Sequence, residues 1–401
     1  MMGLGQERHA RIDWLMLCAL GGLMIAGLAF IYSATSAAET AQVTAWYRQR
    51  WVLQVVWYLA GMSAAVLVCM VEYHILARWS LVAYWATILL LVAVLIPGVG
   101  SMRFGARRWI DLGVFQVQPS EFAKLSFIFA QAHFLSRPAD ELRLTNVFWK
   151  AIGLLVLPFL LIMKEPDLGS ALILLPVGLT MLFVAGVPVR YIRNLVIGAG
   201  MLIALIMVDV LFAPPNWQIK LEDYQKRRLL VYFGRDFAPP KATPAERAEA
   251  RRAQRNYSYN VDQSMISVGS GGMFGKGWCK GTQNALGYLP RAVAHNDFIF
   301  SVIAEEKGFM GSVIIIALYS VVLFTGIRIA GQARDRLGKL LAVGVVAMLF
   351  SHVFINIGMN IRLMPVTGVP LPLLSYGGSS VLCSLIAAGI LQNVYLYRRS
   401  Y

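Results

Sequence analysis

Asp297 stands where a polar loop runs into an apolar segment, and it is the strongest candidate for acid–base chemistry in the chain. The residues that follow it, Phe298 to Ile303, are almost all apolar. A carboxylate held where water gives way to an apolar phase is partly desolvated, which makes it a stronger base. The alternative is structural, because an Asp before a helix can cap the first-turn N–H groups. Position alone favours the cap.

Glu121 and Lys124 form a second candidate, three residues apart inside an otherwise apolar segment. Residues at this spacing share one helix face, and Pro119 suits a first helical turn. Ionisable residues inside apolar spans are costly, so each is a functional hypothesis with an expected partner. The pair either fixes helix packing as an ion pair or presents Lys124 to a substrate phosphate, and the sequence leaves both interpretations open.

Arg107 and Arg108 are adjacent in the stretch 105–113. Guanidinium forks match phosphate oxygens, which makes a diphosphate headgroup a natural ligand. General attraction to anionic lipid headgroups explains the two arginines equally well. Asp167, in the short turn 164–169, precedes an apolar run and is expected to cap the next helix. Capping does not prevent Asp167 from also facing a polar cavity.

Two irregular stretches complete the set. The stretch 269–277 is rich in glycine but lacks the P-loop spacing of a nucleotide site. Its backbone N–H groups suit an anion nest, and an ordinary glycine turn is the alternative. The stretch 365–380 breaks the helical pattern at membrane depth, where irregular backbone is tolerated only when it is buried in protein or lines a cavity. We take Lys276 and Ser375 from these stretches as further candidates for substrate binding.

The elements that must position these residues are membrane helices. Of the 401 residues, 58% are hydrophobic and only 14% are charged, which is too apolar for a soluble domain of this size. Only helices or closed barrels satisfy the backbone in lipid, and the apolar runs lack the alternation of a barrel, so an all-α polytopic bundle is predicted. About ten spans of roughly 20 residues are expected. They lie near 14–32, 51–71, 77–97, 119–137, 147–163, 168–186, 191–213, 297–330 (its first part amphipathic), 338–359 and 373–395.

We expect one membrane domain over 1–401, with a large extracytoplasmic loop at 214–296 between the seventh and eighth spans. Within this loop, 238–256 begins with prolines and continues with a composition typical of a helix. Lys and Arg are more frequent in the short loops beside the two termini than in the short loops opposite, which predicts cytoplasmic termini.

Composition excludes several other kinds of site. The net charge of +15 is scattered over loops without a basic helix or RNA motif, so no nucleic-acid partner is expected. The four cysteines have no CxxC spacing, and neither a disulfide framework nor a zinc site is predicted. His133 and His352 are expected to pack within helices.

Six stretches in combination resemble the SEDS family (shape, elongation, division and sporulation), the polytopic peptidoglycan polymerases of bacteria. They span most of the chain, and the pairing of GKGW with GTQ, together with NIGM at 356–359, resembles the elongation branch more than the division branch. The six stretches are GARRWIDLG at 105–113, QPSEFAKL at 118–125, EPDLGSALIL at 165–174, DQSMISVGSGGMFGKGWCKGTQ at 262–283, NDFIFSVIAEEKGFMG at 296–311 and GVPLPLLSYGGSS at 368–380.

The resemblance implies a glycosyltransferase that polymerises lipid II without a nucleotide cofactor, assisted by cations that include a divalent ion such as Mg²⁺ or Mn²⁺. It implies that Asp297 deprotonates the 4-hydroxyl of the acceptor sugar while polyprenyl diphosphate leaves the donor. The groups implied around the diphosphate and the cavity are Arg107, Arg108, Lys124, Glu121 and Asp167. The sequence departs from the family pattern at Asn296, where a threonine is usual, and in a longer approach at 291–296.

The implied partners are lipid II and the growing glycan strand, a class B penicillin-binding protein that supplies transpeptidation, other proteins of the elongation complex, and membrane lipids. The implied location is the bacterial cytoplasmic (inner) membrane. Two other function classes stay open: a lipid II flippase and a non-catalytic scaffold. A flippase needs access from both leaflets and no committed base, which separates it from the enzyme.

Overall fold

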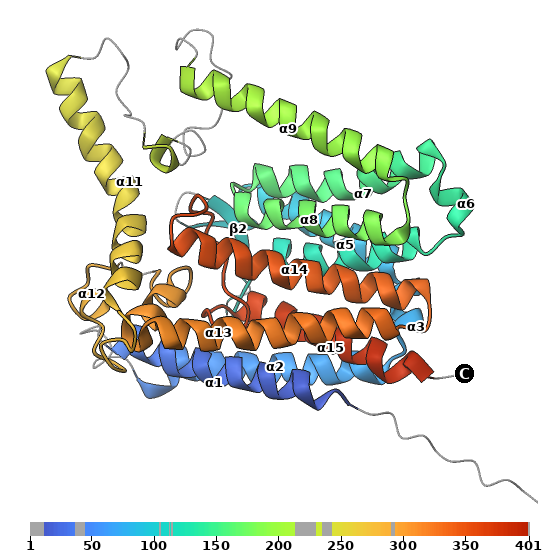
Figure 1. The fold of residues 1–401 in the computed structure, drawn as a ribbon, viewed down its shortest axis with the longest axis horizontal. Coiled ribbons are helices and arrows are strands. Elements are labelled where there is room, and N and C mark those ends of the chain that lie inside the picture. The colour runs from blue at the N-terminus through green and yellow to red at the C-terminus, as the bar shows by residue number, and fades with distance from the viewer. Residues whose placement is uncertain are drawn as a thin grey trace, which may run out of the picture.

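The computed structural model describes residues 12–36, 45–103, 106–111, 113, 115–212, 230–234, 243–289 and 293–399. Each predicted apolar segment lies in a helix, and the long helices run side by side (Figure 1). These helices are α1 (Trp14–Ser36), α2 (Arg50–Met70), α4 (Ser80–Leu95), α5 (Pro119–Leu135), α7 (Thr145–Lys164), α8 (Leu168–Ala185), α9 (Val189–Phe212), α13 (Ile299–Gln332), α14 (Arg336–Asn360) and α15 (Gly378–Leu396).

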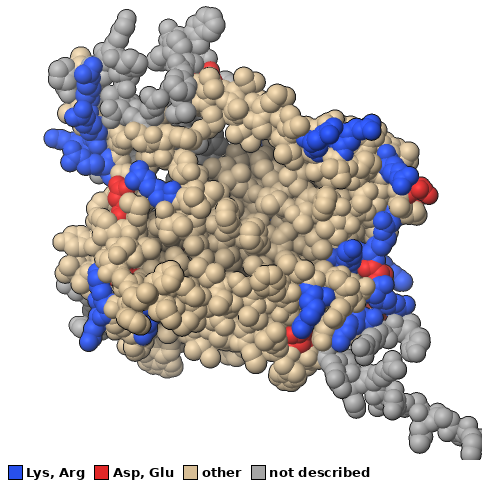
Figure 2. Space-filling view, in the orientation of Figure 1, with Lys and Arg blue, Asp and Glu red and all other residues tan. Residues whose placement is uncertain are grey.

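The helices have the length and composition of a multi-pass membrane protein. Among the described residues, eight helices are long and apolar enough to cross a membrane, while α4 has 16 residues and α5 has 17. Lys and Arg gather at the two ends of the bundle and leave a broad uncharged band between them (Figure 2). The polytopic helical prediction is therefore confirmed.

Shorter elements cover the two ends of the bundle. One end carries α3 (Tyr73–Arg78), α6 (Ala139–Leu142), the start of α1 and the end of the chain, and the other carries α11 (Pro244–Ser270), α12 (Thr282–Ala285) and a small sheet (Figure 1). Single-turn 3₁₀ helices lie at Trp46–Arg48 and Tyr397–Arg399.

The sheet is antiparallel, in the order β1 (Gly100–Arg103), β2 (Ala106–Asp111) and β3 (Gln116–Val117). An all-α prediction missed it, because these short charged strands carry no clear alternation.

Burial divides the bundle into central and peripheral helices. Within the most apolar window of each helix, 78% of α15 and 61% of α14 is buried, against none of α9. The molecule is hollowed beneath α9 in the space-filling view (Figure 2). Helices α5 and α14 and the first part of α13, which carry candidate residues, are therefore largely buried, and α9 lies at the periphery beside α8.

Helix α13 is two helices joined across a break at Gly308, which has φ 64° and ψ −158°. Before the break, the side chains from Ile299 to Glu306 are all buried. The prediction of an amphipathic start to this span is wrong, because protein rather than a water–lipid boundary surrounds it. A loop from the glycine-rich stretch covers the break: Lys276 N–H donates to Glu305 O at 3.0 Å, and Phe309 N–H donates to Gly272 O at 2.8 Å.

The long loop contains more helix than the sequence suggested. Residues 244–256 of the stretch predicted to have helical composition lie in α11, which continues to Ser270. Residues 238–242, and with them the start of that stretch, lie outside the described residues, as do 213–229 and 290–292. The extracytoplasmic placement of 214–296 stays a prediction.

Gly308→Ala should destabilise the protein by at least about 2 kcal/mol, because a backbone conformation of this kind is essentially restricted to glycine and costs others 1–3 kcal/mol. The new Cβ would also lie 2.4 Å from Gly275 N. The measurement is thermal unfolding in detergent. Gly153→Ala is the matched control, since its Cβ meets nothing within 4 Å and alanine favours a helix interior. Equal unfolding temperatures for both variants would contradict the interpretation.

Candidate active site

Asp297 lies in a half-buried position just before α13, with its backbone fixed on both sides. Its N–H donates to Val293 O at 3.0 Å, and its carbonyl accepts hydrogen bonds from Asn356 Nδ2 at 3.0 Å and Asn360 Nδ2 at 3.2 Å. The helix begins at Ile299 with Phe298 at the N-cap, so Asp297 lies one residue before the predicted capping position. The structure holds the Asp297 main chain through α14 rather than through a cap.

The two asparagines belong to a larger buried network. Asn360 Oδ1 accepts hydrogen bonds from Ser301 Oγ at 2.6 Å and Ser264 Oγ at 3.2 Å, which joins α13 and α11 to α14. Asn356 Nδ2 also donates to Val369 O at 2.7 Å. The asparagines therefore connect Asp297 to the irregular segment near the C-terminus.

That segment, residues 361–377, lies against Asp297 on its other side. A Cβ placed on Gly368, which has φ +72°, would lie 3.5 Å from Asp297 Oδ2. Ser375 Oγ donates to Asn296 O at 2.5 Å and accepts from Leu371 N–H at 2.8 Å, while Tyr376 N–H donates to His295 O at 2.9 Å. Ser375 is 2% exposed and joins the two segments, so its predicted role in substrate binding stays a prediction beside this structural one.

His295, two residues before Asp297, is also fixed from outside its own segment. Arg50 Nη1 lies 2.9 Å from His295 Nδ1, and the imidazole is 2% exposed. Arginine can only donate, so Nδ1 is the acceptor. This hydrogen bond connects the segment that precedes Asp297 to α2.

Glu121 and Lys124 form the predicted pair, and a third residue joins them. Lys124 Nζ lies 2.8 Å from Glu121 Oε1 and 2.8 Å from His352 Nε2, with Glu121 and Lys124 only 3% and 1% exposed. Because an ammonium only donates, His352 Nε2 accepts and its Nδ1–H donates to Pro370 O at 3.3 Å. His352 packs within a helix as predicted, whereas His133 is exposed and that prediction is wrong.

Asp167 caps α8, as predicted, and also accepts hydrogen bonds from other elements. Its Oδ1 accepts from Ser170 N–H at 3.2 Å, and its Oδ2 accepts from Gln118 Nε2 at 2.8 Å and Ser120 Oγ at 3.1 Å. Arg108 Nη1 lies 3.8 Å from Asp167 Oδ1. The structure thus brings Asp167 together with the start of α5 and with one of the two predicted arginines.

Arg108 reaches Asp167 from a β-bulge. Ser101 pairs with Trp109 and Met102 with Arg107, so Arg108 is the extra residue of β2. A bulge bends its strand and re-aims side chains, often next to active sites. Arg107 is partly exposed on the same strand. The two arginines therefore differ in surroundings although they are neighbours in sequence.

Glu165, which the sequence analysis did not single out, lies in the same turn as Asp167. Its side chain is 0% exposed, and neither carboxyl oxygen has a hydrogen-bond partner among the described residues. Burial, and then the charge of Asp167, raise the pKa of Glu165 to about 9, while Arg108 opposes the shift. At neutral pH the group is therefore a neutral carboxylic acid.

Lys276 lies in the loop that covers the Gly308 break. Its Nζ donates to Ser270 Oγ at 2.8 Å, Thr282 Oγ1 at 2.7 Å and Glu305 Oε1 at 2.7 Å. An ammonium has three N–H donors, and these contacts use all of them. Lys276 therefore stabilises the loop in this conformation, and its predicted role in substrate binding stays a prediction.

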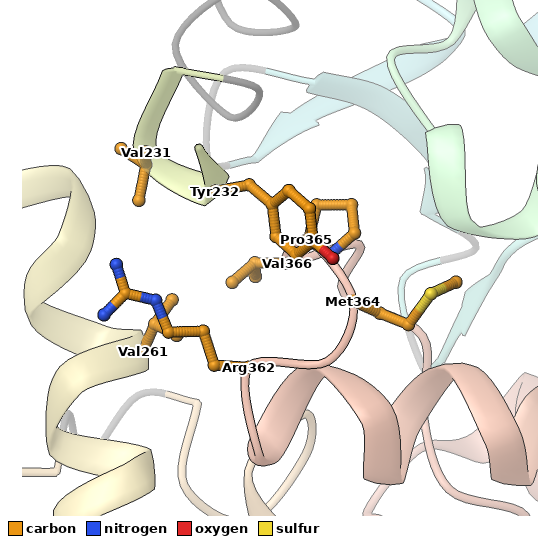
Figure 3. Close-up of a pocket in the computed structure, with 7 residues that line it drawn as sticks. All are labelled: Val231, Tyr232, Val261, Arg362, Met364, Pro365 and Val366. Atoms are coloured by element: carbon orange, nitrogen blue, oxygen red, sulfur yellow. The ribbon is translucent and has the colours of Figure 1, made fainter. Parts of the chain in front are cut away.

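Within the described residues, no group of three or more His, Cys, Asp or Glu side chains is arranged to hold a metal ion. The divalent cation stays a prediction on which no step below depends. One further pocket lies between α11, the turn at 230–234 and the loop after α14 (Figure 3). Its mostly apolar lining contains no predicted site residue: Val231, Tyr232, Val261, Arg362, Met364, Pro365 and Val366.

Comparison with known proteins places this arrangement in a family. The family model FTSW_RODA_SPOVE, described as a cell cycle protein, matches residues 13–400. The chain belongs to this family. It is 35% identical over 339 residues to the peptidoglycan glycosyltransferase MrdB of Escherichia coli K12, covering 84% of each chain. It is 38% identical over 341 residues to the stage V sporulation protein E of Bacillus subtilis, covering 84% of this chain and 85% of that one.

Solved structures agree with the family assignment. The Thermus thermophilus rod shape determining protein RodA matches with a TM-score of 0.66 and 26% identity, over 97% of this chain and 98% of that chain. A second solved chain matches with a TM-score of 0.75 and 27% identity, over 97% of this chain and 99% of that chain. Its structure is described as the structural coordination of polymerization and crosslinking by a peptidoglycan synthase complex. The resemblance to the SEDS polymerases is confirmed.

Three polar residues of α14 that support the site share a sequence signal that was not used to predict it. His352, Asn356 and Asn360 are spaced four apart in an apolar helix, and residues at this spacing lie on one face. A polar stripe inside a membrane span marks a functional face. Glu165 offers no such signal, because a carboxylate in a turn between two spans is ordinarily exposed.

Lys124→Met should destabilise this family member by about 3–5 kcal/mol, because it leaves Glu121 buried without its partner. The double variant Glu121→Leu with Lys124→Met should recover most of this loss, since apolar replacement of a buried ion pair is often neutral or better. Thermal unfolding in detergent measures both. Arg137→Met, which removes the exposed Arg137–Glu141 pair, is the control and should change stability by less than about 1 kcal/mol. A double variant as unstable as the single one would argue against the ion-pair interpretation.

Proposed function

We propose that this protein is a peptidoglycan glycosyltransferase that polymerises lipid II into glycan strands, with Asp297 as the general base. The observation that carries the proposal is the Asp297 carboxylate, half-buried against Gly368 while its main chain is fixed by Asn356 and Asn360. Family membership and the names of the relatives supply the reaction class. Position and chemistry together favour the enzyme over a structural role for Asp297.

The reaction follows from these groups. Asp297 takes the proton of the acceptor sugar's 4-hydroxyl, and that oxygen attacks the anomeric carbon of the donor. The bond from the anomeric carbon to the diphosphate breaks, and polyprenyl diphosphate leaves with the electron pair. General-base assistance of this kind is worth about 10²–10⁴-fold in rate, and a base must be held in place to supply it, which the two asparagines do.

The leaving diphosphate needs cationic groups, because its negative charge grows as the bond breaks. Arg108 and Lys124 are the best placed of the predicted cations, since each contacts a residue or turn that in turn contacts the region of 367–370. Lys124 reaches it through His352 and Pro370. Arg108 reaches it through the α8 turn, where a Cβ on Gly169 would meet Val369 Cγ2 at 2.4 Å. Arg107, on the same strand, is assigned to the same task.

We place the reaction at the outer face of the bacterial cytoplasmic membrane, with both termini in the cytoplasm. The Lys and Arg distribution favours this orientation, and the site residues lie toward the end of the bundle that carries α11 and the sheet. A role in cell elongation is proposed from the motif resemblance; a probable peptidoglycan glycosyltransferase FtsW and a stage V sporulation protein E also match over most of the chain. The proposed partner is a class B penicillin-binding protein, in keeping with the structural match to a chain of a peptidoglycan synthase complex.

Asp297→Asn should lower glycan-chain formation from lipid II by at least about 10²-fold, because amide nitrogen and oxygen cannot accept the proton. The assay compares wild type and variant, each purified with the penicillin-binding partner whose own active site is inactivated, in liposomes with lipid II supplied on the outer side. Asp140→Asn, an exposed Asp in α6, is the matched control and should polymerise like the wild type.

The outcomes separate the three function classes. Equal polymer from wild type and Asp297→Asn would mean that Asp297 is structural and the base lies elsewhere. No polymer from either protein, with the complex intact, would favour the flippase or the scaffold. If the folded double variant of Glu121 and Lys124 polymerises normally, Lys124 is a packing residue and does not contact the diphosphate.

A further inference from the structure

Glu165 is a buried acid that the reaction above does not use. It ends α7, where its N–H donates to Ile162 O at 3.1 Å, and Asp167 N–H donates to the same carbonyl at 3.4 Å. The turn therefore fixes the main chain of Glu165, while its carboxyl group, 0% exposed, has no hydrogen-bond partner in the described part of the chain. A buried polar group left unpaired costs about 1–3 kcal/mol, so this one calls for an explanation.

Two charged groups lie close enough to the Glu165 carboxyl to influence it electrostatically: Asp167 from the same turn and Arg108 from β2. The oxygens of Asp167 are already used by Ser170, Gln118 and Ser120. An ionised Glu165 would thus be a second buried anion beside Asp167, with no donor within hydrogen-bond distance among the described residues. The neutral acid avoids this cost and presents an O–H donor.

Arg108 has a matching unused donor. Its Nη1 lies 3.8 Å from Asp167 Oδ1, which orients the guanidinium at a distance longer than a hydrogen bond. Its Nε is buried and has no hydrogen-bond partner among the described residues. Arg108 Nε–H and Glu165 O–H are therefore two buried donors near one another, and each still needs an acceptor.

We propose that Arg108 and the carboxyl group of Glu165 form one subsite, in which both donate hydrogen bonds to a phosphate oxygen of the lipid diphosphate. This inference rests on the glycosyl transfer proposed above, since it assigns the diphosphate of that donor substrate to a particular pair. A carboxylic acid suits the position because it donates a hydrogen bond without adding negative charge beside a phosphate. Glu165 is then a binding residue whose protonation state controls affinity.

The test measures binding of farnesyl diphosphate, a soluble prenyl diphosphate, to the full chain at pH 7.0 and 9.5. A group with a pKa of about 9 is about one-quarter neutral at pH 9.5. Wild-type affinity should therefore fall about fourfold more between the two pH values than that of Glu165→Gln, which keeps a neutral donor. Glu165→Leu, which has the shape but no donor, should bind at least about tenfold more weakly at pH 7.0.

Controls isolate the role of the carboxyl group. Glu141→Gln, the same substitution at an exposed position in α6, should bind as the wild type does at both pH values. Binding of farnesol, which lacks phosphate, should not depend on the residue at 165. Thermal unfolding of each variant confirms that it is folded before affinity is compared.

Two results would overturn the subsite: wild-type affinity in Glu165→Leu, or a pH dependence in Glu165→Gln as large as in the wild type. Because the assay needs no polymerisation, it is independent of the reaction assay. A protein that fails to polymerise lipid II but keeps Glu165-dependent binding of the diphosphate would remove the enzymatic proposal and leave the subsite in place.

Discussion

The structure depends on how one irregular segment satisfies its backbone inside a membrane bundle. Residues 361–377 are not helical, yet most of their side chains from Thr367 to Ser375 are buried. In such surroundings every carbonyl needs a donor, and helices supply them as side chains. Tyr58 donates to Leu373 O and Tyr319 to Pro372 O, and the carbonyls at 369, 370 and 375 accept from Asn356, His352 and Gln54. The candidate site is built on the segment that these donors hold.

The same segment explains why charged residues far apart in sequence converge. Gly368 lies against Asp297, Val369 against the α8 turn and Pro370 against His352, the partner of Lys124. Three adjacent residues thus touch the proposed base, the turn that carries Asp167 and Glu165, and the buried ion pair. An unpaired charge is costly in the low dielectric of the interior, and these ionisable groups are stabilised by fixed neighbours. Glu165 is the exception, because its neutral form needs no partner of opposite charge.

The sequence allowed prediction of whatever has a local signal. Long apolar runs located the helices to within a few residues, the spacing of Glu121 and Lys124 predicted their pairing, and Asp167 was recognised as a cap from its position before an apolar run. Contacts between distant segments could not be predicted from local patterns. His352, for example, is 228 residues from Lys124 in the sequence, and no local pattern links them. The bulge at Arg108 depends on the register of two strands that were not predicted. Asp297 was identified, but its support by Asn356 and Asn360 was not, although their spacing in an apolar helix was visible.

The hydrogen bonds that connect the glycine-rich loop to α13 across the Gly308 break have a mechanical consequence. Four backbone hydrogen bonds, at Lys276, Gly277, Phe309 and Met310, tie the glycine-rich loop to both halves of α13, and Ser264 of α11 shares Asn360 with Ser301. A pull on α11 is therefore transmitted to the short buried half-helix that starts two residues after Asp297. The end of the bundle that carries α11 is thereby connected to the candidate base, and a displacement of α11 would strain Asn360, the same asparagine that holds the Asp297 carbonyl.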